Sequence, residues 1–180
     1  MELNYTLTRD DYIAFNLHHA NNDSASKKRI NFLRILLPVA AALMMVLTLL
    51  TNHSGVVTTI ISIVPALAIG IVWIIFLPRF YNFLLVKNIK KMLEKREKSE
   101  FEGPVHLVLG QDTIHLQKET GTSETKYIAV ERIEEDSQHL YIYIGAISAI
   151  IVPFVAFASQ QEKNLFLQQL SSKANVQQNI

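Results

Sequence analysis

The pattern of hydrophobic and polar positions divides the chain into a long uncharged centre and two patterned flanks. The centre runs from Ile35 to Pro78, and its 44 residues include no Asp, Glu, Lys or Arg. A membrane-spanning helix needs about 20 mostly apolar residues, because the hydrocarbon core is about 30 Å thick and each helical residue rises about 1.5 Å. The centre is long enough to cross twice, and residues 52–55 (Asn-His-Ser-Gly) provide a turn. We therefore expect a two-helix transmembrane hairpin over residues 31–78, with its helices at about 31–51 and 56–77.

Before the hairpin, residues 1–30 predict a strand followed by an amphipathic helix. Leu3, Tyr5 and Leu7 alternate with polar residues, which is the period of a half-buried strand over residues 2–8. Thr8 then suits the N-cap of a helix over residues 9–19, with acidic side chains in its first turn. Because a hairpin returns the chain to the side from which it entered, we expect this strand to pair with, or pack on, the C-terminal sheet.

After the hairpin, residues 79–102 predict an amphipathic, basic stalk helix. Val86, Ile89 and Leu93 share one stripe of this helix, and lysines occupy another. The segment ends at Gly103-Pro104, where the hydrophobic period changes from that of a helix to that of a strand.

Residues 103–180 predict a small β-rich domain that ends in a helix. Alternating runs form a hairpin and further strand candidates, at residues 105–109, 113–117, 125–130, 132–135, 140–144 and 149–153. Ser159 suits the N-cap of a final helix that carries Leu165, Phe166 and Leu170.

The run from Leu140 to Ser159 has two interpretations. Its 20 residues carry no charge, and hydropathy alone would make them a third membrane span. However, 11 of the 18 residues from Leu140 to Phe157 are β-branched or aromatic, and Gly145 and Pro153 lie where a hairpin needs turns. Two short strands buried on a small sheet also give a nearly continuous apolar run. The composition favours strands and leaves both alternatives open.

Basic residues concentrate beside the hairpin and predict its orientation. Residues 79–102 carry a net charge of +3 and residues 103–180 a net charge of −3, in a chain of net charge +1. Basic residues flank both outer ends of the hairpin and none lies in its connecting loop, so the positive-inside rule predicts that both termini are cytoplasmic. The residues expected to contact anionic lipid headgroups, non-specifically and as point charges, are Lys27, Lys28, Arg29, Arg34, Arg79, Lys87, Lys90, Lys91 and Lys95.

Four residues in or beside the second span have expected roles in the bilayer. Trp73 and Tyr81 suit the aromatic belt at the membrane interface. Ala66 and Gly70 form a small-xxx-small pair that would let the two helices approach closely. Since the uncharged centre holds no ionisable carboxylate or amine, an ion or proton pathway through the hairpin is disfavoured.

The sequence contains no recognisable catalytic or metal-binding motif, so neither enzymatic activity nor a cofactor is expected. Without cysteine there is no disulfide, zinc–thiolate site or thiol nucleophile. His18 and His19 would point about 100° apart on a helix, which fits one surface and one core position better than a metal site. The four carboxylates between Glu131 and Asp136 lack the spacing of a cation loop and are expected to line a solvated strand edge. His106 and His115 are placed to face each other across the first hairpin, without further ligands.

Two segments make the chain resemble the YcxB-like family of bacterial membrane proteins. They are YTLTRDDYIAFNLHH at residues 5–19 and YIAVERIEEDSQHLYIYIGAISAIIVPFVAF at residues 127–157, with the basic-flanked hairpin between them. The resemblance implies a β-rich domain similar to bacterial pleckstrin-homology-like (PH-like) modules, capped by a C-terminal helix, and so favours strands at 140–159. Basic residues commonly follow the family's proline, whereas Phe154 and Val155 follow it here, so no role of those basic residues is carried over. The residues that match the family's pattern are Val130, Ile133, Glu135, Pro153 and Phe157.

These observations predict an α+β membrane protein of the bacterial inner (plasma) membrane, with a transmembrane hairpin and a cytoplasmic PH-like domain. The leading hypothesis is a non-enzymatic, membrane-anchored interaction or regulatory module. The alternative is an accessory subunit of a membrane transport or envelope complex whose hairpin packs on partner helices, and a membrane-bound enzyme is less favoured. The expected partners are the lipid bilayer and either a protein partner or a second copy of the chain. The mildly acidic distal domain argues against a nucleic-acid partner.

Overall fold

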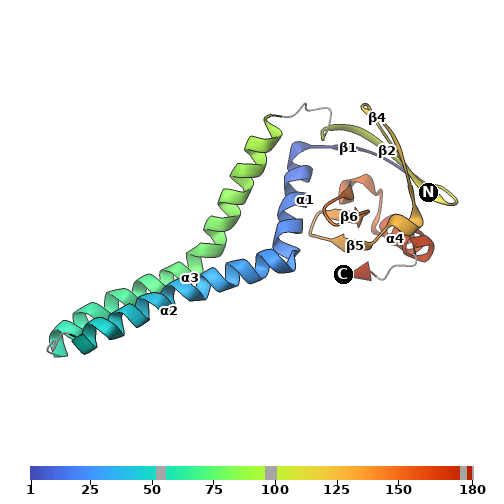
Figure 1. Ribbon diagram of the computed structural model, residues 1–180. Helices are drawn as coiled ribbons and strands as arrows, with labels where there is room; N and C mark the ends of the chain where they lie inside the picture. Colours follow the sequence, from blue (N-terminus) through green and yellow to red (C-terminus); the bar gives the residue numbers. More distant parts are fainter. Residues whose placement is uncertain (52–55, 96–100, 175–177, 180) are drawn as a thin grey trace. The chain divides into compact units, whose positions relative to one another are not determined.

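The computed structural model describes residues 1–51, 56–95, 101–174 and 178–179, and these form two compact units (Figure 1). The β unit combines Met1–His19 with Ile89–Ile180, and the helical unit is Ala20–Asn88. The helical unit is therefore inserted, along the sequence, into the chain that builds the β unit.

The first sheet of the β unit is assembled from strands on both sides of this insertion. It contains β1 (Glu2–Leu7), β2 (Gly103–Leu109), β3 (Thr113–Lys118) and β4 (Gly121–Lys126), all antiparallel and in that order. The alternating apolar side chains of β1 are buried, whereas its polar side chains are exposed. The predicted pairing of the N-terminal strand with the C-terminal sheet is confirmed, because β1 pairs along its whole length with β2.

The second sheet contains β5 (Arg132–Glu135), β6 (His139–Tyr143), β7 (Ala149–Pro153) and the two-residue β8 (Gln178–Asn179). Its order is β7-β6-β5-β8, and β8 pairs parallel to β5. The uncharged run from Leu140 to Ser159 thus contains the antiparallel β6–β7 hairpin, and the third-span alternative is wrong. Every residue of β6 is buried, which explains why this strand lacks the alternation of a one-sided sheet.

Two short 3-10 turns make the corners of this unit: η2 (Tyr127–Ala129) joins β4 to β5, and η3 (Phe154–Ala156) follows β7. The strand predicted at 125–130 is therefore wrong beyond Lys126. The opposite corner is joined by Tyr5, whose hydroxyl donates a 2.9 Å hydrogen bond to the carbonyl of Ile151. Burial, together with the nearby charge of Asp11, raises the pKa of Tyr5, so this phenol stays protonated and able to donate.

The C-terminal helix α4 (Gln160–Ala174) closes the hydrophobic core that both sheets share. Its predicted N-cap is confirmed, since the Ser159 hydroxyl accepts a hydrogen bond from the backbone N–H of Glu162 at 3.2 Å. Phe166 and Leu170 are buried as expected, but Leu165 is exposed because it lies on the solvent side of the helix.

Three helices, α1 (Arg9–Asn22), α2 (Ser24–Thr51) and α3 (Val56–Leu93), lie between β1 and β2 in the sequence. α3 continues without a break from the second apolar run into the predicted stalk, and it ends at Leu93 rather than near residue 102; residues 96–100 lie outside the described residues. The C-terminal end of α3 belongs to the β unit, where Ile89 and Leu93 are buried. Arg9 donates a 2.9 Å hydrogen bond to the carbonyl of Lys90, which caps this end of α3 with a positive charge.

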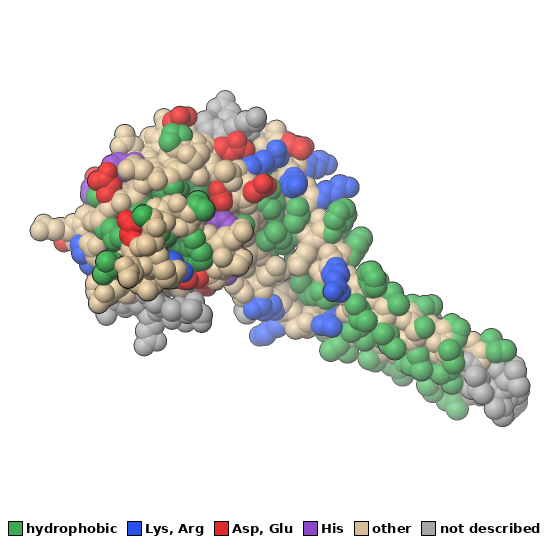
Figure 2. Space-filling model, turned by 180° about the vertical axis from the view of Figure 1, so that it is seen from behind, with side chains coloured by type: hydrophobic (Ala, Val, Ile, Leu, Met, Phe, Trp, Pro, Cys, Tyr) green, Lys and Arg blue, Asp and Glu red, His purple; other side chains and the backbone are tan. Residues whose placement is uncertain are grey.

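The helical unit consists of long apolar helices with exposed side chains. In the described part of the chain, two stretches are long and apolar enough to cross a membrane, Ser26–Leu47 and Ile63–Leu93, and none of the residues in their most apolar windows is buried. Figure 2 shows hydrophobic side chains along both helices and Lys and Arg side chains at the end away from their connection. α2 and α3 approach each other where a Cβ added at Gly70 would lie 3.8 Å from the Cβ of Pro38.

The pairing of β1 with β2 predicts which of its residues carry stability. We expect Leu3→Ala to lower the free energy of unfolding by about 2–5 kcal/mol, because Leu3 is only 2 % exposed and its removal leaves a cavity. The neighbouring Asn4→Ala is the matched control and should stay within about 0.5 kcal/mol, because Asn4 is exposed. Urea denaturation of the full chain in mild detergent, followed by near-ultraviolet circular dichroism, measures both. Equal effects of the two substitutions would contradict the burial of β1.

Candidate functional site at the junction of α1 and the second sheet

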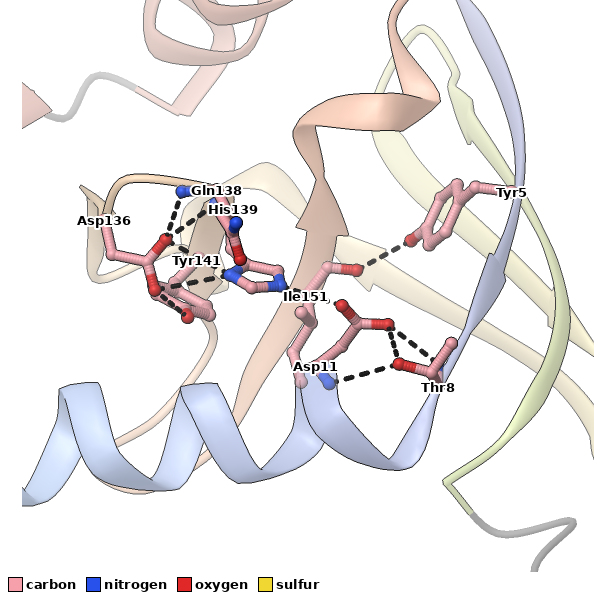
Figure 3. Close-up of polar contacts among 8 residues, drawn as sticks. All are labelled: Tyr5, Thr8, Asp11, Asp136, Gln138, His139, Tyr141 and Ile151. Carbon is pink, nitrogen blue, oxygen red and sulfur yellow. Dashed lines mark hydrogen bonds and ion pairs between the residues drawn. The ribbon is translucent and has the colours of Figure 1, made fainter.

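His139 occupies the centre of a polar cluster between α1 and the β5–β6 hairpin (Figure 3). Its Nε2 lies 2.8 Å from Oδ1 of Asp11, and its Nδ1 lies 3.1 Å and 3.3 Å from the two carboxylate oxygens of Asp136. The residue is only 5 % exposed, and its ring stacks on that of Tyr141 at 5.7 Å. A buried imidazole between two carboxylates ties a helix near the start of the chain to a strand 128 residues later.

Asp11 has a second role, because its other oxygen caps α1. Oδ2 of Asp11 accepts hydrogen bonds from the backbone N–H and the hydroxyl of Thr8, both at 2.7 Å, and the Thr8 hydroxyl in turn accepts from the N–H of Asp11. This reciprocal arrangement is a capping box with Asp in the third position, and it confirms Thr8 as the N-cap. The same carboxylate therefore begins the helix and attaches it to the second sheet.

Asp136 is held by donors from its own turn. Tyr141 donates to Oδ2 at 2.5 Å, and the backbone N–H groups of Gln138 and His139 donate to Oδ1 at 2.7 Å. Burial raises the pKa of Asp136, but the hydrogen bonds from Tyr141 and the two backbone groups outweigh it, so the net pKa lies below its ordinary value. Burial and the adjoining carboxylate raise the pKa of Tyr141, which keeps its proton on the donor.

A second contact holds the other end of α1. His18 Nε2 lies 2.8 Å from Oε2 of Glu134, and Arg132 donates from Nε to Oε1 of the same carboxylate at 2.8 Å. The guanidinium of Arg132 also lies 3.6 Å above the ring of Tyr143. Burial raises the pKa of Glu134, but the hydrogen bonds and charges of His18 and Arg132 give a net lowering.

The acidic run around β5 is thus mostly paired, and the expectation of a solvated edge is wrong for three of its four carboxylates. Besides Glu134 and Asp136, Glu135 accepts a 2.7 Å hydrogen bond from Lys163 of α4, whose ammonium lies 3.8 Å from the ring centroid of Phe154. Only Glu131 is exposed. The run joins the second sheet to α1 on one side and to α4 on the other.

His18 and His19 both pack against aromatic rings, and the split into a surface and a core position is wrong for this pair. The ring of His18 lies 4.7 Å from that of Tyr141, and the ring of His19 stacks on Phe15 at 6.1 Å. Phe15 is buried, as the predicted apolar stripe of this helix requires.

His106 and His115 lie on the outer face of the first sheet as diagonal neighbours, since the register places His106 opposite Gln117 and His115 opposite Val108. Each has a single carboxylate partner, Glu2 at 2.6 Å and Glu124 at 3.1 Å respectively. An open concavity of about 540 Å³ lies over this face. Among the described residues, no group of three His, Asp or Glu side chains is placed to hold a metal ion.

Most of the predicted membrane-contact residues lie at the surface of their helices. Lys27, Lys28, Arg29, Arg79, Lys87, Lys90, Lys91 and Lys95 are exposed, and Arg34 is half-buried. Trp73 is exposed and Tyr81 half-buried. Of the small-xxx-small pair, Gly70 faces α2, where an added Cβ would lie 3.8 Å from Pro38, whereas Ala66 is exposed.

The fold and this junction define an α+β protein in which two long apolar helices interrupt a small two-sheet unit. Residues 109–170, about a third of the 180-residue chain, match the family described as YcxB-like protein, so the resemblance to that family is confirmed over this segment. No curated protein and no solved structure matches the chain. Four of the residues in the family pattern, Val130, Ile133, Pro153 and Phe157, are buried, and the fifth, Glu135, is the partner of Lys163.

The sequence did not predict the centre of this junction as a site. Its residues are Asp11, Asp136, His139 and Tyr141. Two of its features can be seen in the sequence: the capping pattern of Thr8 and Asp11, and His139 directly before an uncharged run. Neither pattern indicates that the two segments meet, because that contact depends on the pairing of β1 with β2.

The hydrogen bond from Tyr141 predicts a pH-dependent loss of stability. We expect Tyr141→Phe to cost about 1.5–3 kcal/mol at pH 7, because it removes a donor to a charged carboxylate. Since the native pKa of Asp136 is lowered, its contribution is complete above the ordinary value of 3.8 and is lost as pH falls through the native value. In the variant this acid loss should begin at higher pH.

Urea denaturation between pH 2.5 and 7 measures this effect. Tyr12→Phe is the control, because the Tyr12 hydroxyl has no hydrogen-bond partner among the described residues, and it should stay within about 0.5 kcal/mol at every pH. An acid transition at the same pH in Tyr141→Phe and the wild type would show that Tyr141 does not support the Asp136 carboxylate.

Proposed function

We propose that the chain is an integral membrane protein of the bacterial inner membrane that presents the β unit to the cytoplasm as a non-enzymatic interaction or regulatory module. The observation that carries this proposal is the exposure of the long apolar stretches of α2 and α3. Burying such surfaces in water-free surroundings is favourable by about 25 cal/mol per Å², so they require a bilayer or a partner of equal apolarity.

The charge distribution supports the orientation. Exposed lysines and arginines lie at the start of α2 and in the second half of α3, whereas the uncharged run extends over the segment that connects the two helices. By the positive-inside rule this arrangement puts the connection outside and both termini in the cytoplasm. The same basic side chains are free to attract anionic headgroups, at about 1 kcal/mol each.

The architecture of the β unit supports a PH-like module. Such a module requires two sheets and a C-terminal helix over their shared core. Here one sheet has four antiparallel strands, and the other has three antiparallel strands plus the short parallel β8. The segment that matches the YcxB-like family covers β3 to β7 and most of α4. The ionisable groups of the junction, such as His139 with Asp11 and His18 with Glu134, pair with one another rather than line an open cavity, which favours an interaction role over catalysis.

Single cysteines test the topology without background, because the chain has no cysteine. We expect Ser54→Cys, between the two helices, to react with a membrane-impermeant maleimide in intact spheroplasts. Thr122→Cys, in β4, should react only after the membrane is permeabilised. The reverse pattern would overturn the orientation, and labelling of both residues in intact spheroplasts of confirmed integrity would overturn the membrane hairpin.

A further inference from the structure

We propose that His139, held between Asp11 and Asp136, is a proton-dependent latch that fastens α1 to the second sheet. This inference concerns the β unit and does not rest on the proposed membrane orientation. It starts from the number of protons on the imidazole. Both ring nitrogens face carboxylate oxygens at hydrogen-bond distance, and an ionised carboxylate only accepts. Both contacts are therefore hydrogen bonds only when the ring carries two protons.

Loss of one proton leaves one hydrogen bond and turns a nitrogen lone pair toward a carboxylate oxygen. The cost of this change cannot be relieved by water, because His139 is buried. The carboxylates themselves have other donors, since Thr8 serves Asp11 and Tyr141 serves Asp136. The neutral imidazole thus weakens the link between the helix and the sheet while leaving each carboxylate satisfied on its own element.

The groups around His139 make this residue, rather than His18 of α1, the sensitive one. His139 faces Asp11 from α1, Asp136 from the β5–β6 turn and the ring of Tyr141 from β6, and none of these is a cation. His18 shares its partner Glu134 with the guanidinium of Arg132, which already balances the carboxylate charge.

The latch has a defined direction. It is closed when the imidazole carries two protons and loosened when it carries one. Histidine side chains in general change their charge between about pH 5 and 8, so pH 5.5 and 8.5 bracket that range. The latch opens again in strong acid, when Asp136 is protonated below its lowered pKa. α1 leads directly into α2, the first apolar helix, so the proton controls how firmly the chain entering that helix is attached to the β unit. Ile13 and Phe15 remain buried in either state, and α1 loosens without leaving the unit.

Amide hydrogen exchange of the full chain in detergent micelles tests the latch. At pH 5.5 and 8.5, after correction for intrinsic exchange rates, we expect protection of a peptide covering residues 12–19 to fall about tenfold at the higher pH. Protection of a peptide covering residues 105–117, in β2 and β3, should not change. His139→Asn should lower protection of residues 12–19 at pH 5.5 and remove its pH dependence. His115→Asn, the same substitution on the outer face of the first sheet, should leave that dependence intact.

Two results would overturn the latch. One is a wild-type protein in which protection of residues 12–19 is the same at both pH values, and this result needs no variant to fold. The other is a folded His139→Asn protein, judged by unchanged protection of residues 105–117, that keeps the wild-type pH dependence. If His139→Asn does not fold, the latch is tested by the wild-type protein alone, from the protection of residues 12–19 and of residues 105–117 at the two pH values.

Discussion

The structure depends on the antiparallel pairing of β1 with β2 across the whole apolar insertion. Ninety-five residues separate Leu7 from Gly103, yet the register between the two strands is unbroken over six pairs. Closing a flexible loop of n residues has an entropic free-energy cost that grows as about (3/2)RT ln n. A pairing between such distant strands is therefore unfavourable unless the intervening chain returns on itself. α2 and α3 make that return, and their close approach at Gly70 shortens the effective loop. β1 then contributes Leu3, Tyr5 and Leu7 to the core of both sheets.

α1 is the element through which this constraint reaches the polar cluster. Its first turn is capped by Thr8 and joined to the end of α3 by the hydrogen bond from Arg9 to Lys90. The chain entering the apolar hairpin and the chain leaving it are thus tied together inside the β unit. Further along α1, contacts from Asp11 and His18 attach it to the second sheet. The junction therefore contacts the segment that continues along the chain into α2.

Local patterns predicted much of this fold, and long-range contacts account for what they missed. The alternation in β1 and the capping residues Thr8 and Ser159 are set by neighbours within a few positions, and all three were predicted correctly. The run at 140–159 was ambiguous because β6 is covered on both faces, which removes the period of two. The carboxylates of β5 were assigned to solvent because their partners are remote: His18 lies 116 residues before Glu134, and Lys163 lies 28 residues after Glu135. The sequence therefore predicted elements and their order, whereas the junction required the tertiary fold.

The most direct test is to remove the helical unit and ask whether the β unit folds from its two separated segments. Residues 20–88 would be replaced by a Gly/Ser linker. Arg9 lies beside Lys90, and α1 rises about 15 Å from there to His19, so a linker of about 12 residues, with a mean reach of about 19 Å, is sufficient. The account predicts a protein that is soluble without detergent, has a β-rich circular dichroism spectrum and protects the amides of residues 3–7 from exchange. Aggregation without detergent, or rapid exchange at residues 3–7 in a folded protein, would contradict it.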